Sequence, residues 1–155
     1  MIQRIQSLFL LAATVLSVII MIHPVSSMMM AGQLEAEFFV YGLMSIGDAP
    51  EMLFNTFPVV IFAAVTLLLT IVTILLYRNR TLQMRICVFN ILLTLGLILS
   101  IFIYYYIFKR KFDISTHAFS YSVVFPFVNV ILIFQAFRGI RRDDLLLKSY
   151  NRLRD

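Results

Sequence analysis

The sequence predicts an all-α membrane protein: an up-down bundle of four transmembrane helices with a short amphipathic helix at its cytoplasmic C-terminus. Hydrophobic residues make up 61% of the 155 residues, and a mean hydropathy of +0.94 is too high for a soluble domain of this size. Four stretches of about twenty residues, enough to cross a bilayer, contain no charged side chain. The chain then ends RGIRRDDLLLKSYNRLRD, which mixes charges with leucines at helical spacing.

The first predicted span covers residues 5–22 and stops at His23-Pro24. Its surroundings are typical of a secretory signal, because a basic start and an apolar run precede Val25-Ser26-Ser27, a passable cleavage site. Since the chain retains this segment, we interpret it as a signal anchor.

The remaining spans are expected at residues 57–77, 86–108 and 117–137. Pro58 suits the first turn of the second span, where a missing N–H does no harm. Short connections make these three helices antiparallel neighbours. The longer connection after the first span contains EAEFFVYGLM, which mixes β-forming residues with a glycine. We expect a short hairpin or an interfacial segment there.

The distribution of lysine and arginine predicts the orientation, because basic loops stay in the cytoplasm. Residues 23–56 contain four acids and no basic residue, so this segment is expected outside. The exception to the pattern is Lys109-Arg110-Lys111, which we expect to reach lipid phosphates beside Tyr104-Tyr105-Tyr106. The other ten of the thirteen basic residues lie on the opposite side. Both termini are therefore predicted to be cytoplasmic.

Small and weakly polar residues mark the packing faces of the third predicted helix. Asn90 and Thr94 share one face, and Gly96 and Ser100 form a small-xxx-small pair on another. Such residues let helices approach closely and form weak interhelical hydrogen bonds. Two packing faces are what a helix with two neighbours needs.

The fourth predicted helix carries Ser122, Pro126 and Asn129 near one face. Pro126 cannot bond to the Ser122 carbonyl, so a kink is expected there. Asn129 should find a hydrogen-bond partner on another helix, because an unpaired amide in hydrocarbon is costly. Thr66 and Ser100 are expected at a similar depth and are the favoured partners. The same residues would also suit a polar crevice for a lipid or a small ligand, and both interpretations stay open.

No acid or base lies at membrane depth, which argues against a pump or an ion-coupled transporter. Cys87 is expected at the cytoplasmic end of its helix and His23 and His117 at the outer end, so no Cys–His nucleophilic pair forms. One cysteine excludes an intramolecular disulfide, and one cysteine with two histidines provides no structural zinc site. We predict no enzyme, no metal and no cofactor.

Residues 138–155 are expected to form a cytoplasmic tail that follows a bundle domain of residues 1–137. The fourth helix should end near Phe137, and Gly139 should let the chain turn. A short amphipathic helix then docks on the protein's own cytoplasmic loop or on a partner subunit, or it lies on anionic lipid. Its predicted docking residues are Arg142, Leu146, Lys148, Tyr150, Arg152 and Leu153, of which Leu146, Tyr150 and Leu153 should form a buried stripe.

The opening MIQRIQ and the closing DDLLLKSYNRLR, together with four spans, resemble a family of small inner-membrane proteins of Bacteroidota classed as a domain of unknown function. The resemblance covers essentially the whole chain, although its specific residues lie at the two ends. It implies a multi-pass protein of the bacterial inner membrane. It implies no activity.

These observations together predict a non-catalytic accessory or scaffold subunit of a larger membrane assembly, concerned with protein export or the cell envelope. The competing hypothesis is a lipid- or small-solute-binding carrier that uses the crevice near Asn129 and Pro126. Expected partners are the lipid bilayer and other membrane-protein subunits, and a homo-oligomer stays open. Nucleic acid is not expected, because the basic residues are few and acids interleave with them.

Overall fold

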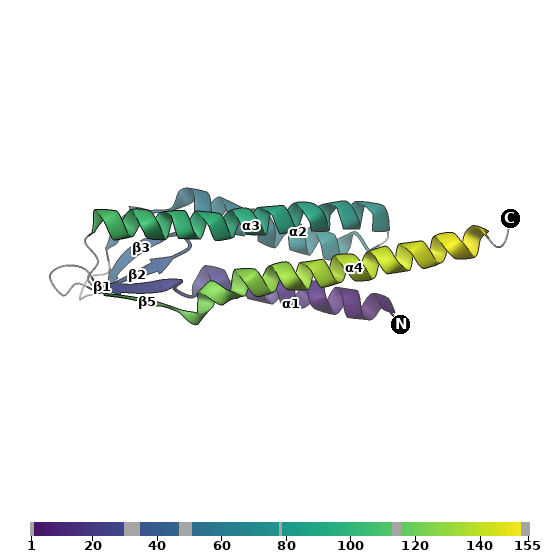
Figure 1. Ribbon diagram of the computed structural model, residues 1–155, viewed down its shortest axis with the longest axis horizontal. Coiled ribbons are helices and arrows are strands. Elements are labelled where there is room, and N and C mark those ends of the chain that lie inside the picture. Colours follow the sequence, from purple (N-terminus) through teal and green to yellow (C-terminus); the bar gives the residue numbers. More distant parts are fainter. Residues whose placement is uncertain (1, 30–34, 47–50, 78, 113–115, 153–155) are drawn as a thin grey trace.

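Four long helices run side by side, a sheet lies at one end of them, and the start of the first helix and the end of the last lie at the other end (Figure 1). The computed structural model describes residues 2–29, 35–46, 51–77, 79–112 and 116–152, and the structural statements below concern these residues.

The helices are α1 (Ile2–Ile22), α2 (Phe57–Leu75), α3 (Arg80–Lys111) and α4 (Phe125–Arg152), and a 3-10 turn, η1 (Tyr121–Val124), precedes α4. All four are long and apolar enough to cross a membrane. Each packs on its neighbours in chain order, and α4 closes the bundle against α1. The second helix has its proline in the first turn, as predicted.

A five-stranded antiparallel sheet is present, so the prediction of an all-α fold is wrong in this part. The strands are β1 (Ser26–Met29), β2 (Glu35–Phe39), β3 (Gly42–Ile46), β4 (Met52–Asn55) and β5 (Thr116–Phe119), in the spatial order β4-β3-β2-β1-β5. The expected hairpin exists as β2 and β3. The sheet extends beyond this hairpin on both sides: β4 pairs with β3, and β1 pairs with β2 and is followed by β5. Strands β1 and β4 come from the first connection, and β5 comes from the connection after α3.

The last turns of α3 form the core of the sheet end, which explains why this helix runs past the predicted span of residues 86–108. The buried ring of Phe108 packs edge-to-face on Phe38 of β2 at 5.1 Å and on Phe54 of β4 at 5.5 Å between centroids. Such contacts add to the free energy gained by burying the rings. Gly42 lets β4 approach, because a Cβ there would lie 2.6 Å from the Phe54 carbonyl oxygen.

The basic cluster at the end of α3 contacts these rings. Arg110 lies 4.7 Å above the ring of Tyr106, and Lys111 lies 4.7 Å above the ring of Phe54. Cation–π contacts and the negative end of the helix dipole both favour positive charge here. These local contacts account for basic residues at the end of the molecule where the charge pattern did not predict them.

The fourth helix differs most from its prediction. It begins at Phe125 instead of His117 and continues through Gly139 to Arg152, without a turn or a separate C-terminal helix. A break was expected because glycine weakens helices. The glycine instead makes room for α1, because a Cβ on Gly139 would lie 2.9 Å from Cγ of Gln6.

A kink in the middle of a helix was expected at Pro126, and the structure has a change of helix type just before this residue. The chain is a 3-10 turn up to Val124 and an α-helix from Phe125, so Pro126 lies in the first turn of α4. The N–H of Phe125 donates to the Ser122 carbonyl, which is the acceptor that the proline cannot serve.

Candidate functional site

The interior of the bundle is lined with polar side chains, which sequence hydropathy does not reveal. On α4 the buried residues recur every three or four positions, and this stripe continues to Asp143, which is 7% exposed. The other three helices carry stripes of the same kind. The buried polar residues of the four helices are Gln6, Ser17, Thr66, Thr70, Thr73, Gln83, Asn90, Thr94, Asn129 and Asp143.

One set of these residues joins α2 to α3. Asn90 Nδ2 donates to Thr70 Oγ1 at 2.8 Å, and Gln83 Nε2 donates to the Thr73 carbonyl at 3.0 Å. Gly96 lies against the neighbouring helix, because a Cβ there would sit 3.1 Å from Phe62 Cε1. The structure therefore places two of the predicted packing residues, Asn90 and Gly96, between α2 and α3.

The other two predicted packing residues of α3 satisfy their own helix. Thr94 Oγ1 donates to the Asn90 carbonyl at 2.7 Å, and Ser100 Oγ donates to the Gly96 carbonyl at 2.8 Å. Thr94 is buried and Ser100 is half-buried. Because each hydroxyl is satisfied by a carbonyl of its own helix, neither needs a hydrogen-bond partner on another helix.

A second set joins α1 to α4. Asn129 Nδ2 donates to Ser17 Oγ at 2.9 Å, and Gln6 Nε2 donates to Asp143 Oδ2 at 2.7 Å. The Asn129 amide is thus paired with another helix, although with α1 and not with the residues of similar depth, Thr66 or Ser100, that the sequence favoured. The Gln6 side chain also fills the space beside Gly139.

The pairing of Gln6 with Asp143 was not predicted. Both residues lie in the two end segments that carry the family resemblance, and the hydrogen bond spans 137 positions of sequence. The available signal was a glycine two residues after the expected end of a span and an aspartate four residues further, on one helix face. The signal was assigned to a helix break because glycine and aspartate both occur at helix ends.

The end of α4 presents an exposed surface with basic and apolar side chains. Arg138, Arg141, Arg142 and Leu145 are exposed. Leu146, expected in the stripe that docks, is 54% exposed within the chain. The helix continues the bundle stripe through Asp143 and turns Leu146 outward. Lys148, Tyr150 and Arg152 lie in α4, but their side chains and the whole of Leu153 are outside the described residues.

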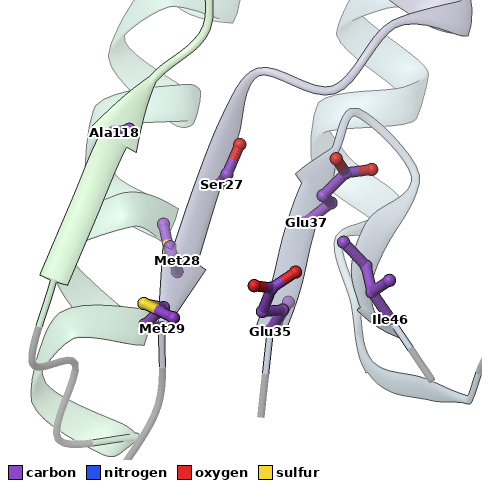
Figure 2. A pocket seen from close by; sticks show the side chains of 8 residues that line it. Ser27, Met28, Met29, Glu35, Glu37, Ile46 and Ala118 are labelled. Atoms are coloured by element: carbon purple, nitrogen blue, oxygen red, sulfur yellow. The ribbon is translucent and has the colours of Figure 1, made fainter. Parts of the chain in front are cut away.

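The opposite end of the molecule carries a pocket of about 290 Å³ on the outer face of the sheet. The carboxylates of Glu35 and Glu37 lie on one face of β2, beside Ser27 and Met29 of β1 (Figure 2). The register explains this, because Ser27 pairs with Glu37 and Met29 with Glu35, so all four side chains share one face. Ile46 and Ala118 complete this face in rows from β3 and β5.

The residues considered for catalysis or metal binding are dispersed. Cys87 is fully buried in an apolar cluster with Ala13, Ile133 and Ile140. His23 is exposed, with its ring 6.1 Å from that of Tyr121. Within the described residues, no three His, Cys, Asp or Glu side chains gather where they could hold a metal ion.

Comparison with known proteins identifies the family. No curated protein matches the chain. Residues 2–153 match the family described as the domain of unknown function DUF4293, which confirms the resemblance seen in the two ends of the sequence. The chain therefore belongs to the DUF4293 family.

Proposed function

We propose that the protein is a non-catalytic, multi-pass protein of the bacterial inner membrane that serves as an accessory or scaffold subunit of a cell-envelope assembly. Its apolar outer surface and polar interior support membrane insertion. Large apolar side chains are exposed along all four helices, among them Leu8, Leu11, Leu68, Leu92 and Leu99. A surface of this kind would drive aggregation in water and suits contact with lipid.

The charge distribution supports an orientation with the sheet outside and both termini in the cytoplasm. Arg80, Arg85, Arg138, Arg141 and Arg142 lie toward the end where α1 begins and α4 ends. Acidic residues gather at the sheet end, in the segment without lysine or arginine. Reporter fusions test this orientation: a periplasmic phosphatase fused after Asp155 should be inactive, and activity there would reverse the map.

The packing of α1 supports its retention as a signal anchor. Gln6 and Ser17 of α1 hydrogen bond to α4, and β1, which starts directly after α1, lies between β2 and β5. Cleavage near Ser27 would remove the helix and cut the strand that joins the two parts of the sheet. The mass of the protein purified from its native membrane should therefore include residues 1–27.

The docking proposal rests on a single observation: α4 continues as one helix past the start of α1 and past α2 and α3, so its last turns project from the bundle (Figure 1). Its exposed Arg141 and Leu145 offer charge and apolar area together. The partner that fits is another subunit whose surface joins acidic side chains to an apolar patch. Anionic lipid is the competing occupant.

The test is co-purification in a gentle detergent from native membranes. Arg141→Glu combined with Leu145→Glu should release the partner, because both changes oppose its acidic and apolar surface. Arg85→Glu is the matched control, since it reverses an exposed charge near the same end but on α3. If the double variant retains every partner of the wild-type protein, α4 is not the docking element.

A truncation also tests the docking proposal, but its boundary must be chosen with care. A separate tail helix could be removed at Arg142, whereas α4 continues past this residue as one helix. Ending the chain after Arg142 would remove Asp143 and leave the buried Gln6 amide without its acceptor. Ending it after Leu146 keeps this pair and removes only the projecting turns. A chain shortened to Leu146 should insert and fold normally and bind the partner more weakly, because it keeps Arg141 and Leu145 but lacks the last turns of α4.

The carrier alternative receives less support from the geometry. Asn129 is 1% exposed and already bonded to Ser17, and Pro126 is buried. An entrance near these residues would need α1 and α4 to separate. The pocket described above lies on the sheet, away from both.

A further inference from the structure

The hydrogen bonds of the bundle divide it into two pairs of helices. Those of Asn129 and Gln6 join α1 to α4, and those of Asn90 and Gln83 join α2 to α3. The pairs also pack against each other, α1 on α2 and α3 on α4. Each pair contributes one buried asparagine to the interior: Asn129 from the first pair and Asn90 from the second.

Both asparagines form their hydrogen bonds through the amide nitrogen alone. Their Nδ2 groups donate to hydroxyls, but neither Asn129 Oδ1 nor Asn90 Oδ1 accepts a hydrogen bond from the described residues. The hydroxyls cannot serve them, because their protons are committed: Ser17 donates to the Ala13 carbonyl at 2.9 Å and Thr70 to the Thr66 carbonyl at 2.8 Å. The two hydroxyls that bind these amides therefore have no proton left for the amide oxygens.

An unpaired amide oxygen buried in apolar surroundings is unfavourable, and a bilayer offers it no donor. What it needs is a small neutral donor. A metal cation such as Ca²⁺ would require six to eight oxygen ligands. The buried carboxylate of α4, Asp143, lies about 21 Å from Asn129 along the helix axis, too far to contribute. Water supplies two donors in the smallest volume and commonly occupies such positions.

Apolar side chains lie on the same side of both positions. Ile133 follows Asn129 by one turn on α4, and Cys87 precedes Asn90 by one turn on α3. Because these helices are antiparallel, both residues lie toward the end of the bundle with the termini, where they join the apolar cluster with Ala13 and Ile140. Along α4 the cluster separates Asn129 from the polar pair at Asp143. This arrangement opposes a continuous file of water through the bundle.

We propose that the bundle binds water at two closed internal sites, one donating to Asn129 Oδ1 and one to Asn90 Oδ1, at the seam between its two helix pairs. Each water completes a hydrogen-bond network that begins on one pair, and its second proton and lone pairs are available to groups of the other pair. The sites explain why asparagines occupy positions where leucine would pack without a polar atom. This inference is independent of the partner proposed above.

Solid-state NMR of the full-length protein in lipid nanodiscs tests the proposal directly. Magnetisation transfer from water should reach the side-chain amides of Asn129 and Asn90 well before it reaches the backbone amide of Ala13, which is in the apolar cluster. Transfer to both asparagines supports the two sites. If either amide responds as slowly as Ala13, the proposal is wrong.

Stability measurements give a second and independent result with opposite signs for the two cases. If water completes the Asn129 site, Asn129→Leu loses that network and the melting temperature falls by about 2–4 °C. If Asn129 Oδ1 is unpaired, the same change removes a buried lone acceptor and the melting temperature rises. Thr66→Val is the control, because the Thr66 hydroxyl donates only to the Ala63 carbonyl of its own helix. A rise for Asn129→Leu overturns the proposal.

Discussion

The bundle and the sheet end differ in what they bury and what they expose. The bundle buries asparagine, threonine, serine and glutamine side chains beside apolar ones, and it exposes many leucine, isoleucine and phenylalanine side chains. The core of the sheet end is aromatic and aliphatic, with Phe38 and Phe108 fully buried, while Glu35 and Ser27 face outward. A protein in water buries apolar groups, whereas helices in lipid gain nothing by hiding leucine and associate through small and polar residues. The difference between the two regions is what the proposed insertion of the helices into lipid predicts.

The largest effect should follow from breaking the aromatic core. Phe108→Ala removes a ring that contacts β2, β4 and its own helix, and such a change costs about 3–5 kcal/mol. Chemical unfolding in detergent and limited proteolysis of residues 23–56 would measure the loss. Phe102→Ala is the matched control, since this ring is on the same helix but exposed on the outside. Equal sensitivity of the two variants would contradict a water-side hydrophobic core around Phe108.

A smaller effect is expected at the close approach of α2 and α3. Gly96→Leu forces a branched side chain onto the ring of Phe62 and should destabilise the protein by about 1–3 kcal/mol. Gly96→Ala should cost less, because its Cβ meets only the edge of a ring that is able to shift. Thermal unfolding of the solubilised protein distinguishes the series. Wild-type stability of Gly96→Leu would mean that this face is not tightly packed.

The bundle was predictable from sequence to the extent that its elements are local. Four charge-free stretches identified the helices because each is apolar over the roughly twenty residues that a membrane span needs. The hairpin of β2 and β3 was accessible for the same reason, since its two strands are adjacent in sequence. The full sheet was not, because β1 pairs with β5 across most of the chain and each strand is only four residues long. A four-residue strand gives too short an alternation to recognise.

The candidate site was predictable in part. Asn90 and Asn129 stood out because a polar residue within an apolar run needs a partner, but which helix supplies that partner depends on depth and rotation. Gly139 shows the limit most clearly. Its sequence neighbourhood predicts a helix end, and only the side chain of Gln6 packed against it explains why a glycine is retained inside a continuous helix.

The pair at the end of the bundle offers a test of intermediate size. Asp143→Leu leaves the Gln6 amide without its acceptor, and Gln6→Leu leaves the carboxylate without its donor. Each single change should destabilise the protein, and the double variant should lose less than the sum, with a coupling energy of about 1 kcal/mol. Thermal or chemical unfolding of all four proteins gives this value. Additive losses would show that the two side chains do not interact.

The smallest effect should come from the surface that we propose to face lipid. Leu99 is 63% exposed on α3. If lipid tails cover it, they are as apolar as the leucine itself, so Leu99→Ala should change stability by no more than about 0.5 kcal/mol. Leu97, two residues away and buried, provides the matched comparison and should lose far more on the same change. Unfolding in nanodiscs measures both. A large loss at Leu99 would mean that protein covers this face, and repeating the exchange at Leu11 and Leu68 would then map which helices meet a second copy or another subunit.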